Sequence, residues 1–420
     1  MNKKDLKWLY LDFNSYFATI EQQINPSIRE KPVAIVPTLT NYTCAIAASY
    51  EAKKLGIKTG TMIYQAKKVC PNLICIKADH EKYIAYHHKL IEEINRHLPI
   101  ENICSIDEVV CKLIGIECNP KKAVSIATSI KSGILKNVGD YISCSIGISV
   151  NKFLAKTASN LQKPNGLKIL YKEDIPNRIK HLKLSDLTGI GKRMEHRLNL
   201  ANIRTISSLY QLSPKNMRKI WGSVQGERFW NMLKGNEVDE ITTKTSTIGH
   251  SHVLHPDWRN PSLAKYILRR LVLKAASRLR RKAYFCKKIK IYIKIKSGLY
   301  AEDKEKFNKV NDSITLLEKS NLIWERIINQ HNLKKIKQIN VVLYELESFN
   351  SVQINFLEKL NYKFESLLKK RRNLSNTMDV INSRFGRDSI TIGSLPKSIN
   401  QFSGTKVAFT RIPDIKEFYE

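Results

Sequence analysis

The sequence lacks the features that would place it in a membrane or in an oxidising compartment. No apolar run reaches the roughly 18 residues of a membrane span, and the apolar stretch near the N-terminus is too short for a secretion signal. None of the eight cysteines forms a CxxC pair, so the usual zinc-binding spacing is missing. We therefore expect a cytoplasmic globular protein with reduced cysteines and no membrane partner.

The chain is also short of acidic residues. Its 71 Lys and Arg face only 38 Asp and Glu, which gives a net charge of +33. Such a charge favours a polyanionic partner, with nucleic acid ahead of an anionic membrane. The imbalance is strongest between Asp257 and Glu302, where 14 residues are basic and none is acidic. This absence of acids favours a surface that faces polyphosphate over a merely solvated one.

One stretch inside the acid-free run has a strict alternation. Residues 288–296 alternate Lys or Tyr with Ile, which predicts a strand with one apolar and one basic face. The basic face carries the candidate DNA-binding lysines Lys288, Lys290, Lys294 and Lys296.

The patterning changes along the 420 residues, which are enough for two to four domains. Strand and helix patterns alternate over 1–166, and 167–238 is helical. Residues 239–247 have the composition of an extended linker, and 248–346 contain the basic run. The tail, 347–420, is polar and less regular. We expect an α+β multidomain protein.

Two carboxylate sites lie in apolar, strand-like surroundings. Asp12 follows the apolar run 8–11, and Asp107 and Glu108 lie inside a predicted hairpin over 103–113. A lone Asp before a helix is usually a cap, and an Asp-Glu pair in a turn is usually solvated. Together they offer three hard oxygen ligands, which suits two Mg²⁺ ions that activate a 3′-hydroxyl and stabilise pyrophosphate. Both Asp107 and Glu108 can reach metal only if the backbone turns or bulges there.

A triphosphate also needs cations and hydrogen-bond donors from the protein. Tyr50 and Lys53 lie one helical turn apart, and Lys163 is another candidate, although each alone is a common surface residue. Gly189 and Gly191 precede a predicted helix and resemble half of a helix-hairpin-helix, whose backbone N–H groups bind DNA phosphate. Taken singly, this GxG pattern is weak, because many helices begin with it.

The motifs together resemble the Y-family translesion DNA polymerases, and nearest the bacterial UmuC-type branch, the catalytic subunit type of polymerase V. The resemblance covers about 1–346, with the motifs in the order and spacing of the family. The matching segments are Asp12–Ala18, Ala48–Lys53, Ser105–Glu108, Ser145–Lys152, Lys163–Gly166 and Gly189–Gly191.

The resemblance implies a right-hand polymerase with a palm built on a ferredoxin-like sheet, fingers, a helical thumb and an α/β little finger. The palm and fingers would take 1–166, with the fingers at about 15–78. The thumb would take 167–238, and the little finger, which grips DNA in this family, would take 248–346.

The resemblance also implies roles for single residues. Asp12, Asp107 and Glu108 are similar to the metal ligands, and Phe13 to a ligand through its backbone carbonyl. A second set is similar to the nucleotide contacts: Phe17 as the steric gate against a ribose 2′-hydroxyl, and Tyr50, Lys53 and Lys163 on the triphosphate. The position of Lys53 is commonly Arg in the family, so the bidentate fork is lost here. Asn14, which we expect to cap the following helix, replaces a carboxylate that some relatives carry.

The implied function is error-prone translesion synthesis in DNA repair and SOS mutagenesis, with primer-template DNA, dNTP and two Mg²⁺ ions. A catalytically weak relative that acts as a DNA-binding scaffold is the alternative, and the three carboxylates argue against it. Another palm-type enzyme, such as a nucleotide cyclase, would lack the helix-hairpin-helix and the little finger.

The tail suggests a further partner. Gln353, Phe356 and Leu357 resemble the peptide by which bacterial polymerases bind the sliding clamp, with the last two apolar residues in swapped order. An amphipathic helix over 352–368 explains the same residues equally well. A UmuD-type accessory protein is a further partner that the resemblance suggests, but the sequence leaves open whether one is needed.

Overall fold

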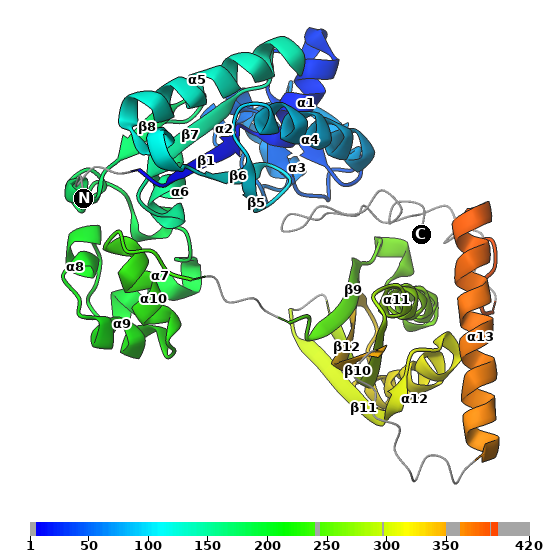
Figure 1. Ribbon diagram of the computed structural model, residues 1–420. Helices are drawn as coiled ribbons and strands as arrows, with labels where there is room; N and C mark the ends of the chain where they lie inside the picture. The colour runs from blue at the N-terminus through cyan, green and yellow to red at the C-terminus, as the bar shows by residue number, and fades with distance from the viewer. Residues whose placement is uncertain (1–5, 240–243, 296–297, 350–361, 387, 394–420) are drawn as a thin grey trace. The chain divides into compact units, whose positions relative to one another are not determined.

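The computed structural model describes residues 6–239, 244–295, 298–349, 362–386 and 388–393. The chain divides near residue 240 into two compact units, each with its own hydrophobic core (Figure 1).

A five-stranded sheet forms the centre of the first unit, in the order β5-β6-β1-β7-β8. Its neighbouring strands are antiparallel except for β7 and β8, which run parallel. Every residue of β1 is buried, as expected of an apolar run in the middle of a sheet. Helices α5 and α6 both pack against β7 and β8, from opposite sides of the sheet (Figure 1). The elements are β1 (Trp8–Phe13), β5 (Ile100–Ile103), β6 (Glu108–Lys112), β7 (Cys144–Ser149), β8 (Leu167–Leu170), α4 (His80–Asn95), α5 (Pro120–Asn137) and α6 (Lys152–Leu161).

A smaller three-stranded sheet follows β1 in the chain. Its order is β3-β2-β4, with β2 and β4 parallel, and α1 packs against β2 and β3. Its core consists mainly of small side chains, including several alanines. The elements are α1 (Tyr16–Ile24), β2 (Val33–Val36), β3 (Ala47–Ala48), α2 (Tyr50–Lys54), α3 (Ile63–Val69) and β4 (Ile74–Lys77).

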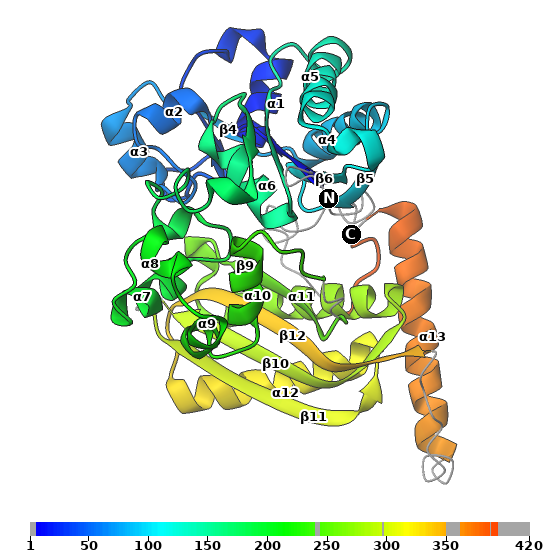
Figure 2. The ribbon, with the colours of Figure 1, turned by 60° about the vertical axis from the view of Figure 1, so that its left-hand side comes forward.

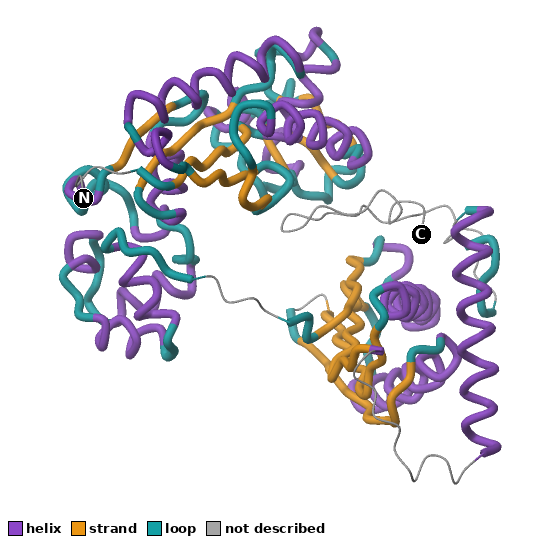
Figure 3. Tube along the Cα trace, in the orientation of Figure 1, coloured by secondary structure: helices purple, strands orange, loops and turns teal. Residues whose placement is uncertain are grey.

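Short helices complete the first unit, in the segment that the sequence predicts to be helical (Figure 3). Their core is continuous with α6, because Phe153 of α6 meets Phe229 of α10 edge to face at 5.2 Å. Gly189, in the turn before α7, has a φ of +94° that favours glycine. The helices are α7 (Lys192–Leu200), α8 (Ile206–Tyr210), α9 (Pro214–Trp221) and α10 (Gln225–Leu233).

The second unit is an antiparallel sheet in the order β11-β10-β12-β9, with α11 and α12 on one face (Figure 2). Ile289, Ile291 and Ile293 of β10 are fully buried under these helices. The alternation predicted for this strand is confirmed. The elements are β9 (Thr247–Val253), α11 (Pro261–Arg281), β10 (Tyr284–Ile295), β11 (Tyr300–Val310), α12 (Ser313–His331) and β12 (Ile336–Ser348).

The tail contains a 24-residue helix, α13 (Tyr362–Phe385). Its first residues overlap the amphipathic helix over 352–368 that the sequence offers as an alternative, and the rest falls where the sequence suggests irregular structure. The helix contacts α11 and α12, and Ser375 in its middle is buried. Leu368 packs against the core of this unit, but polar and charged side chains make the hydrogen bonds and ion pairs to α11 and α12, so the apolar periodicity that usually reveals a packed helix is weak here. None of the helices in the described part of the chain is long and apolar enough to cross a membrane.

Candidate active site

The register of the central sheet brings the two predicted carboxylate sites together. Asp12 on β1 lies directly opposite Glu108 on β6. Asp107 precedes β6 in a bend over 105–107, and its carbonyl accepts a hydrogen bond from the Phe13 N–H at 2.8 Å. The backbone turn that the sequence requires at this point is therefore present. Three carboxylates meet at one end of β1.

Burial sets the electrostatics of this end of the sheet. It raises the pKa of the Asp12 carboxyl, against the attraction of Lys163, and the negative charge of Glu108 raises it further. Burial also raises the pKa of Asp107, whose carboxylate accepts a hydrogen bond from the Ser105 hydroxyl at 2.6 Å. The negative charges of Asp12 and Glu108 add to the rise in the pKa of Asp107. Such mutual shifts are characteristic of sites that bind a cation or move a proton.

The three predicted triphosphate contacts lie beside these carboxylates. The Lys163 ammonium pairs with Asp12 at 2.5 Å. Lys53 donates to the Ser15 hydroxyl at 2.7 Å and lies 4.6 Å from the centre of the Tyr50 ring. Burial and the charge of Lys163 lower the pKa of Lys53, while burial and the charge of Asp12 raise the pKa of Tyr50 to about 12. The structure therefore brings all three to the carboxylates.

Asn14 has a different role from the helix cap that we predicted. Ser15, with a φ of +47°, precedes α1, and no side chain of the described residues caps that helix. The Asn14 amide instead donates to the Ser145 hydroxyl at 3.0 Å and accepts from the Asn165 N–H at 2.8 Å. It thereby ties the end of β1 to β7 and to the loop that carries Lys163. Only tertiary structure supplies these partners, so the prediction of a cap was wrong.

Two further residues of the site, Tyr10 and Lys156, were not predicted. Both bind Glu108, which Lys156 contacts through both carboxylate oxygens. The sequence contains a signal for each, since Tyr10 lies on the same strand face as Asp12, and Lys156 one helical turn beyond Lys152. Neither signal separates them from the many other Tyr and Lys residues.

Phe13 and Phe17 are both buried in an aromatic cluster. The Phe17 ring stacks on Tyr83 at 4.5 Å and meets His80 edge-on at 5.7 Å. Phe13 contributes a backbone carbonyl at the carboxylate end of β1, and its role as a ligand stays a prediction. The sugar-gate role of Phe17 likewise stays a prediction.

The donor set at this end of β1 suits a hard divalent cation. Every candidate ligand is an oxygen, which Mg²⁺ prefers, and the carboxylates already attract the ammonium groups of Lys163 and Lys156. Among the residues that the structure describes, no group of three or more His, Cys, Asp or Glu side chains is already arranged as a metal cage. The ligands fit the ion chemically, with lysines paired to two of them.

The candidate DNA contacts lie on two elements. Gly191 precedes α7 with open space around its Cβ position, which leaves the helix N-terminus approachable beside Gly189. Lys288, Lys290 and Lys294 are half-buried on the sheet face opposite the buried isoleucines. Lys288 pairs with Glu345, and Lys290 pairs with Glu302 at 2.8 Å. Lys296 lies outside the described residues, as do the clamp candidates Gln353, Phe356 and Leu357.

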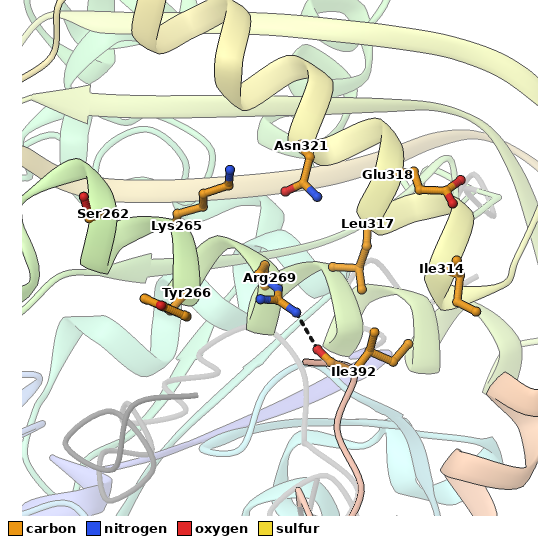
Figure 4. A pocket seen from close by; sticks show the side chains of 9 residues that line it. All are labelled: Ser262, Lys265, Tyr266, Arg269, Ile314, Leu317, Glu318, Asn321 and Ile392. Carbon is orange, nitrogen blue, oxygen red and sulfur yellow. Dashed lines mark hydrogen bonds between the residues drawn. The ribbon is translucent and has the colours of Figure 1, made fainter. Parts of the chain in front are cut away.

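The basic residues of α11 serve a different surface from the lysines of β10. Arg280 binds Asp379 of α13 through two contacts of 2.6 and 2.9 Å, and Arg270 pairs with Asp388 at 2.9 Å. Arg269 donates to the Ile392 carbonyl at 2.7 Å, beside a pocket between α11 and α12 (Figure 4). The prediction that the acid-free run forms one polyphosphate-facing surface was wrong for these arginines, which hold the tail of the chain.

Three family models match successive parts of the chain. A model of the impB/mucB/samB family matches residues 11–160, and one of the C-terminal domain of the same family matches 245–356. A model described as the thumb domain of DNA polymerase-iota matches 185–237.

Curated relatives match over most of the chain. The chain is 32% identical to a DNA polymerase IV of Moorella thermoacetica over 300 residues, or 70% of this chain and 74% of the relative. It is 28% identical to a DNA polymerase IV of Oceanobacillus iheyensis over 389 residues, or 91% and 90%.

Solved structures match at lower identity. A chimera of the Y-family DNA polymerase Dbh has a TM-score of 0.68 at 19% identity, covering 81% of this chain and 99% of its own. An insertion ternary complex of Dbh DNA polymerase has a TM-score of 0.52 at 21% identity, with the same coverage.

Proposed function

Because this chain belongs to the Y family of DNA polymerases and is a DNA-directed DNA polymerase, we propose that it performs error-prone translesion synthesis. The predicted fold class, a right-hand polymerase with thumb and little finger, is confirmed. The exact domain boundaries are part of the proposal. The residue roles and the two-ion mechanism are also part of it.

One observation carries the proposal. Groups from five separate segments of the chain meet at the end of β1: Asp12, Tyr50 with Lys53, Asp107 with Glu108, Lys156 and Lys163. Carboxylates for cations, beside the ammonium groups of Lys53 and Lys163 for phosphates, are what nucleotidyl transfer requires.

We assign the chemistry to these groups as follows. Two Mg²⁺ ions held by Asp12, Asp107, Glu108 and the Phe13 carbonyl would activate the primer 3′-hydroxyl and stabilise the leaving pyrophosphate. Lys163 exchanges its pairing with Asp12 for the triphosphate. Lys53 and the Tyr50 hydroxyl bind the same triphosphate, and the single ammonium of Lys53 gives one charge without the fork of Arg.

Selection of the sugar and grip on DNA complete the proposed reaction. Phe17 closes the space that a ribose 2′-hydroxyl would need. The backbone at Gly189 and Gly191 binds phosphate in the thumb, and Lys288, Lys290 and Lys294 do so from the open sheet face. Primer-template DNA and dNTP are the substrates, and the protein works in the cytoplasm.

The finer assignment within the family is also a proposal. The relatives described above bear the name DNA polymerase IV, which supports polymerase activity, and a role in copying past damage during an SOS response is our proposal. They give no support to the UmuC-type branch or to a UmuD-type accessory protein. We retain the sliding clamp as a proposed partner through Gln353, Phe356 and Leu357.

Primer extension with Mg²⁺ and four dNTPs tests the proposed site. Asp107→Ala should slow extension by at least roughly a hundredfold, because metal ligation contributes several kcal/mol. DNA binding by the same variant should persist. Asp140→Ala is the matched control, since this exposed carboxylate pairs with Arg29 and Gln23 at the surface. Near-normal extension by Asp107→Ala would sink the assignment.

A template with an abasic site tests the translesion role separately. We expect the wild-type protein to insert a nucleotide opposite the lesion and to extend from it. Extension of undamaged template together with a complete stop at the lesion would leave the polymerase activity intact and remove translesion synthesis.

A further inference from the structure

Glu108 is held by two groups that have no assigned role in the reaction. The Tyr10 hydroxyl donates to one carboxylate oxygen, Oε2, at 2.8 Å. The Lys156 ammonium donates to both oxygens, to Oε1 at 2.8 Å and to Oε2 at 2.7 Å. The three side chains are largely buried, with Tyr10 3% exposed.

The fold places these groups together for simple reasons. Tyr10 precedes Asp12 by two residues on β1, so both project from the same face of the sheet. Glu108 lies opposite Asp12 and is therefore diagonal to Tyr10. Helix α6 packs on this face, and its Lys156 ammonium lies 5.4 Å from the centre of the Tyr10 ring. Sheet register and helix packing fix the contact network.

We propose that Tyr10 is a positioning residue for Glu108 and that Lys156 is an internal cation that a metal ion must displace from it. This inference rests on the proposed role of Glu108 as a metal ligand. It follows that Tyr10 favours metal binding by Glu108, whereas Lys156 opposes it, although both bind the same carboxylate.

The division of labour follows from which oxygen each group contacts. A carboxylate has about four lone-pair positions, so one oxygen can bind an ion while the other accepts a hydrogen bond. Oε1 receives the Lys156 ammonium and not the Tyr10 hydroxyl. Glu108 could therefore hold an ion only where that ion took the place of the Lys156 ammonium. The neutral Tyr10 hydroxyl stays on Oε2 and keeps the carboxylate in its orientation.

Charge balance gives Lys156 a reason to be present. Asp12, Asp107 and Glu108 repel one another in the ion-free protein, and each is partly buried. Lys156 and Lys163 neutralise one carboxylate each. Because Lys156 pairs with Glu108, it competes with a metal ion for that carboxylate.

Mn²⁺ binding measured by electron paramagnetic resonance tests the proposal without turnover. The sample is the full-length protein with template and a dideoxy-terminated primer, in the presence of dNTP. Tyr10→Phe should weaken Mn²⁺ binding roughly tenfold, because it removes a hydrogen bond to a charged group. Lys156→Met should tighten it by about fivefold, while Lys156→Arg, which keeps the cation, should restore the wild-type affinity.

Two controls separate the outcomes. Lys152→Met removes a positive charge one turn earlier on α6, where Lys152 lies over the Trp8 ring, and should have a smaller effect. If Lys152→Met tightens Mn²⁺ binding as much as Lys156→Met does, the loss of any nearby positive charge explains the effect. The proposed displacement of Lys156 from Glu108 would then be wrong. Glu108→Gln should abolish high-affinity Mn²⁺ binding.

The variants also distinguish the proposed metal site from the proposed positioning of its ligand. If Glu108→Gln leaves Mn²⁺ binding and primer extension unchanged, the proposed metal site itself fails. If Glu108 is needed but Tyr10→Phe and Lys156→Met move the Mn²⁺ affinity in the same direction, or leave it unchanged, the positioning proposal fails alone.

Discussion

Asp107 has a carboxylate whose pKa is raised by burial and by two neighbouring negative charges. A carboxylic acid whose pKa is raised in the folded protein binds more protons in the folded than in the unfolded state. It therefore destabilises the folded protein increasingly as the pH rises from the ordinary pKa of 3.8 through the raised pKa. Asp107→Asn is neutral at every pH. We therefore predict a higher melting temperature for this variant at pH 7 in EDTA, with a gain that shrinks toward pH 4.

Asp140 supplies a control for the thermal unfolding series, because its pKa is shifted in the opposite direction to that of Asp107. Its pKa is lowered by hydrogen bonds from Arg29 and Gln23, so its contribution to stability is present above its unfolded pKa and is lost as pH falls. Asp140→Asn should not raise the melting temperature at pH 7. A loss of stability by Asp107→Asn at pH 7 would contradict the burial argument.

Phe17 has a second prediction at the scale of a single side chain. Its stacking on Tyr83 fixes the ring, so a smaller side chain opens space without a change of backbone. Phe17→Ala should raise ribonucleotide incorporation relative to deoxyribonucleotide by roughly ten- to a hundredfold. The ratio of single-nucleotide insertion rates measures it. A folded variant with an unchanged ratio would identify Phe17 as core only.

The sequence predicted the carboxylates of the candidate site better than their surroundings. Asp12, Asp107 and Glu108 could be found because carboxylates are rare in apolar strands. Lys156 could not, because one lysine among 71 basic residues gains its meaning only from the packing of α6 on β1. Tyr10 likewise became part of the site only through the register that sets it diagonal to Glu108.

At the scale of elements, β10 and α11 divide the acid-free run between opposite sides of one sheet. DNA binding measured at several salt concentrations gives the slope of the logarithm of the association constant against the logarithm of salt concentration. Changing Lys288, Lys290 and Lys294 together to Ala should make this slope less steep, by about 0.9 for each duplex phosphate that the protein no longer neutralises. Changing three cations of α11 and its C-terminal cap, Lys265, Arg269 and Lys282, removes the same charge from the helical face and should leave the slope unchanged. Equal slopes for the two triple variants would refute the assignment of the DNA face to β10.

The contact between α11 and α13 gives a stability prediction. The Arg280 side chain is only 6% exposed and binds Asp379 through two hydrogen bonds. Asp379→Ala leaves a buried cation uncompensated, which should cost about 3–5 kcal/mol of unfolding free energy in the second unit. Glu325→Ala breaks the exposed pair with Lys265 and should cost at most about 1 kcal/mol.

Chemical unfolding followed by circular dichroism distinguishes the two pairs. Equal and small decreases in unfolding free energy for Asp379→Ala and Glu325→Ala would mean that α13 is held by other interactions. Most of this helix escaped the sequence prediction because Arg371, Ser375 and Asp379, through which it binds α11 and α12, are polar. Their partners are far away in the sequence, and local patterns do not contain them.

At the scale of the whole molecule, the two units have separate hydrophobic cores. A protein that ends at residue 238 should therefore fold and retain metal-dependent primer extension. It should lack the β10 lysines that we propose bind phosphate, so its processivity and its salt slope should both fall. Single-turnover extension and processivity on a long template measure the two effects. A salt slope equal to that of the full-length protein would contradict the role of the second unit.

The groups of the site come from distant parts of the chain, and the Asp12–Lys163 pair alone spans 151 residues. Contacts of such separation close long loops at an entropic cost and form late in folding. During synthesis, the N-terminal strand leaves the ribosome long before Lys163 does. An unfinished chain therefore carries Asp12 without Lys163. For most of that time it also lacks β6, the strand that begins with Glu108. For a DNA polymerase, this order of assembly means that a chain still being synthesised lacks part of the proposed active site.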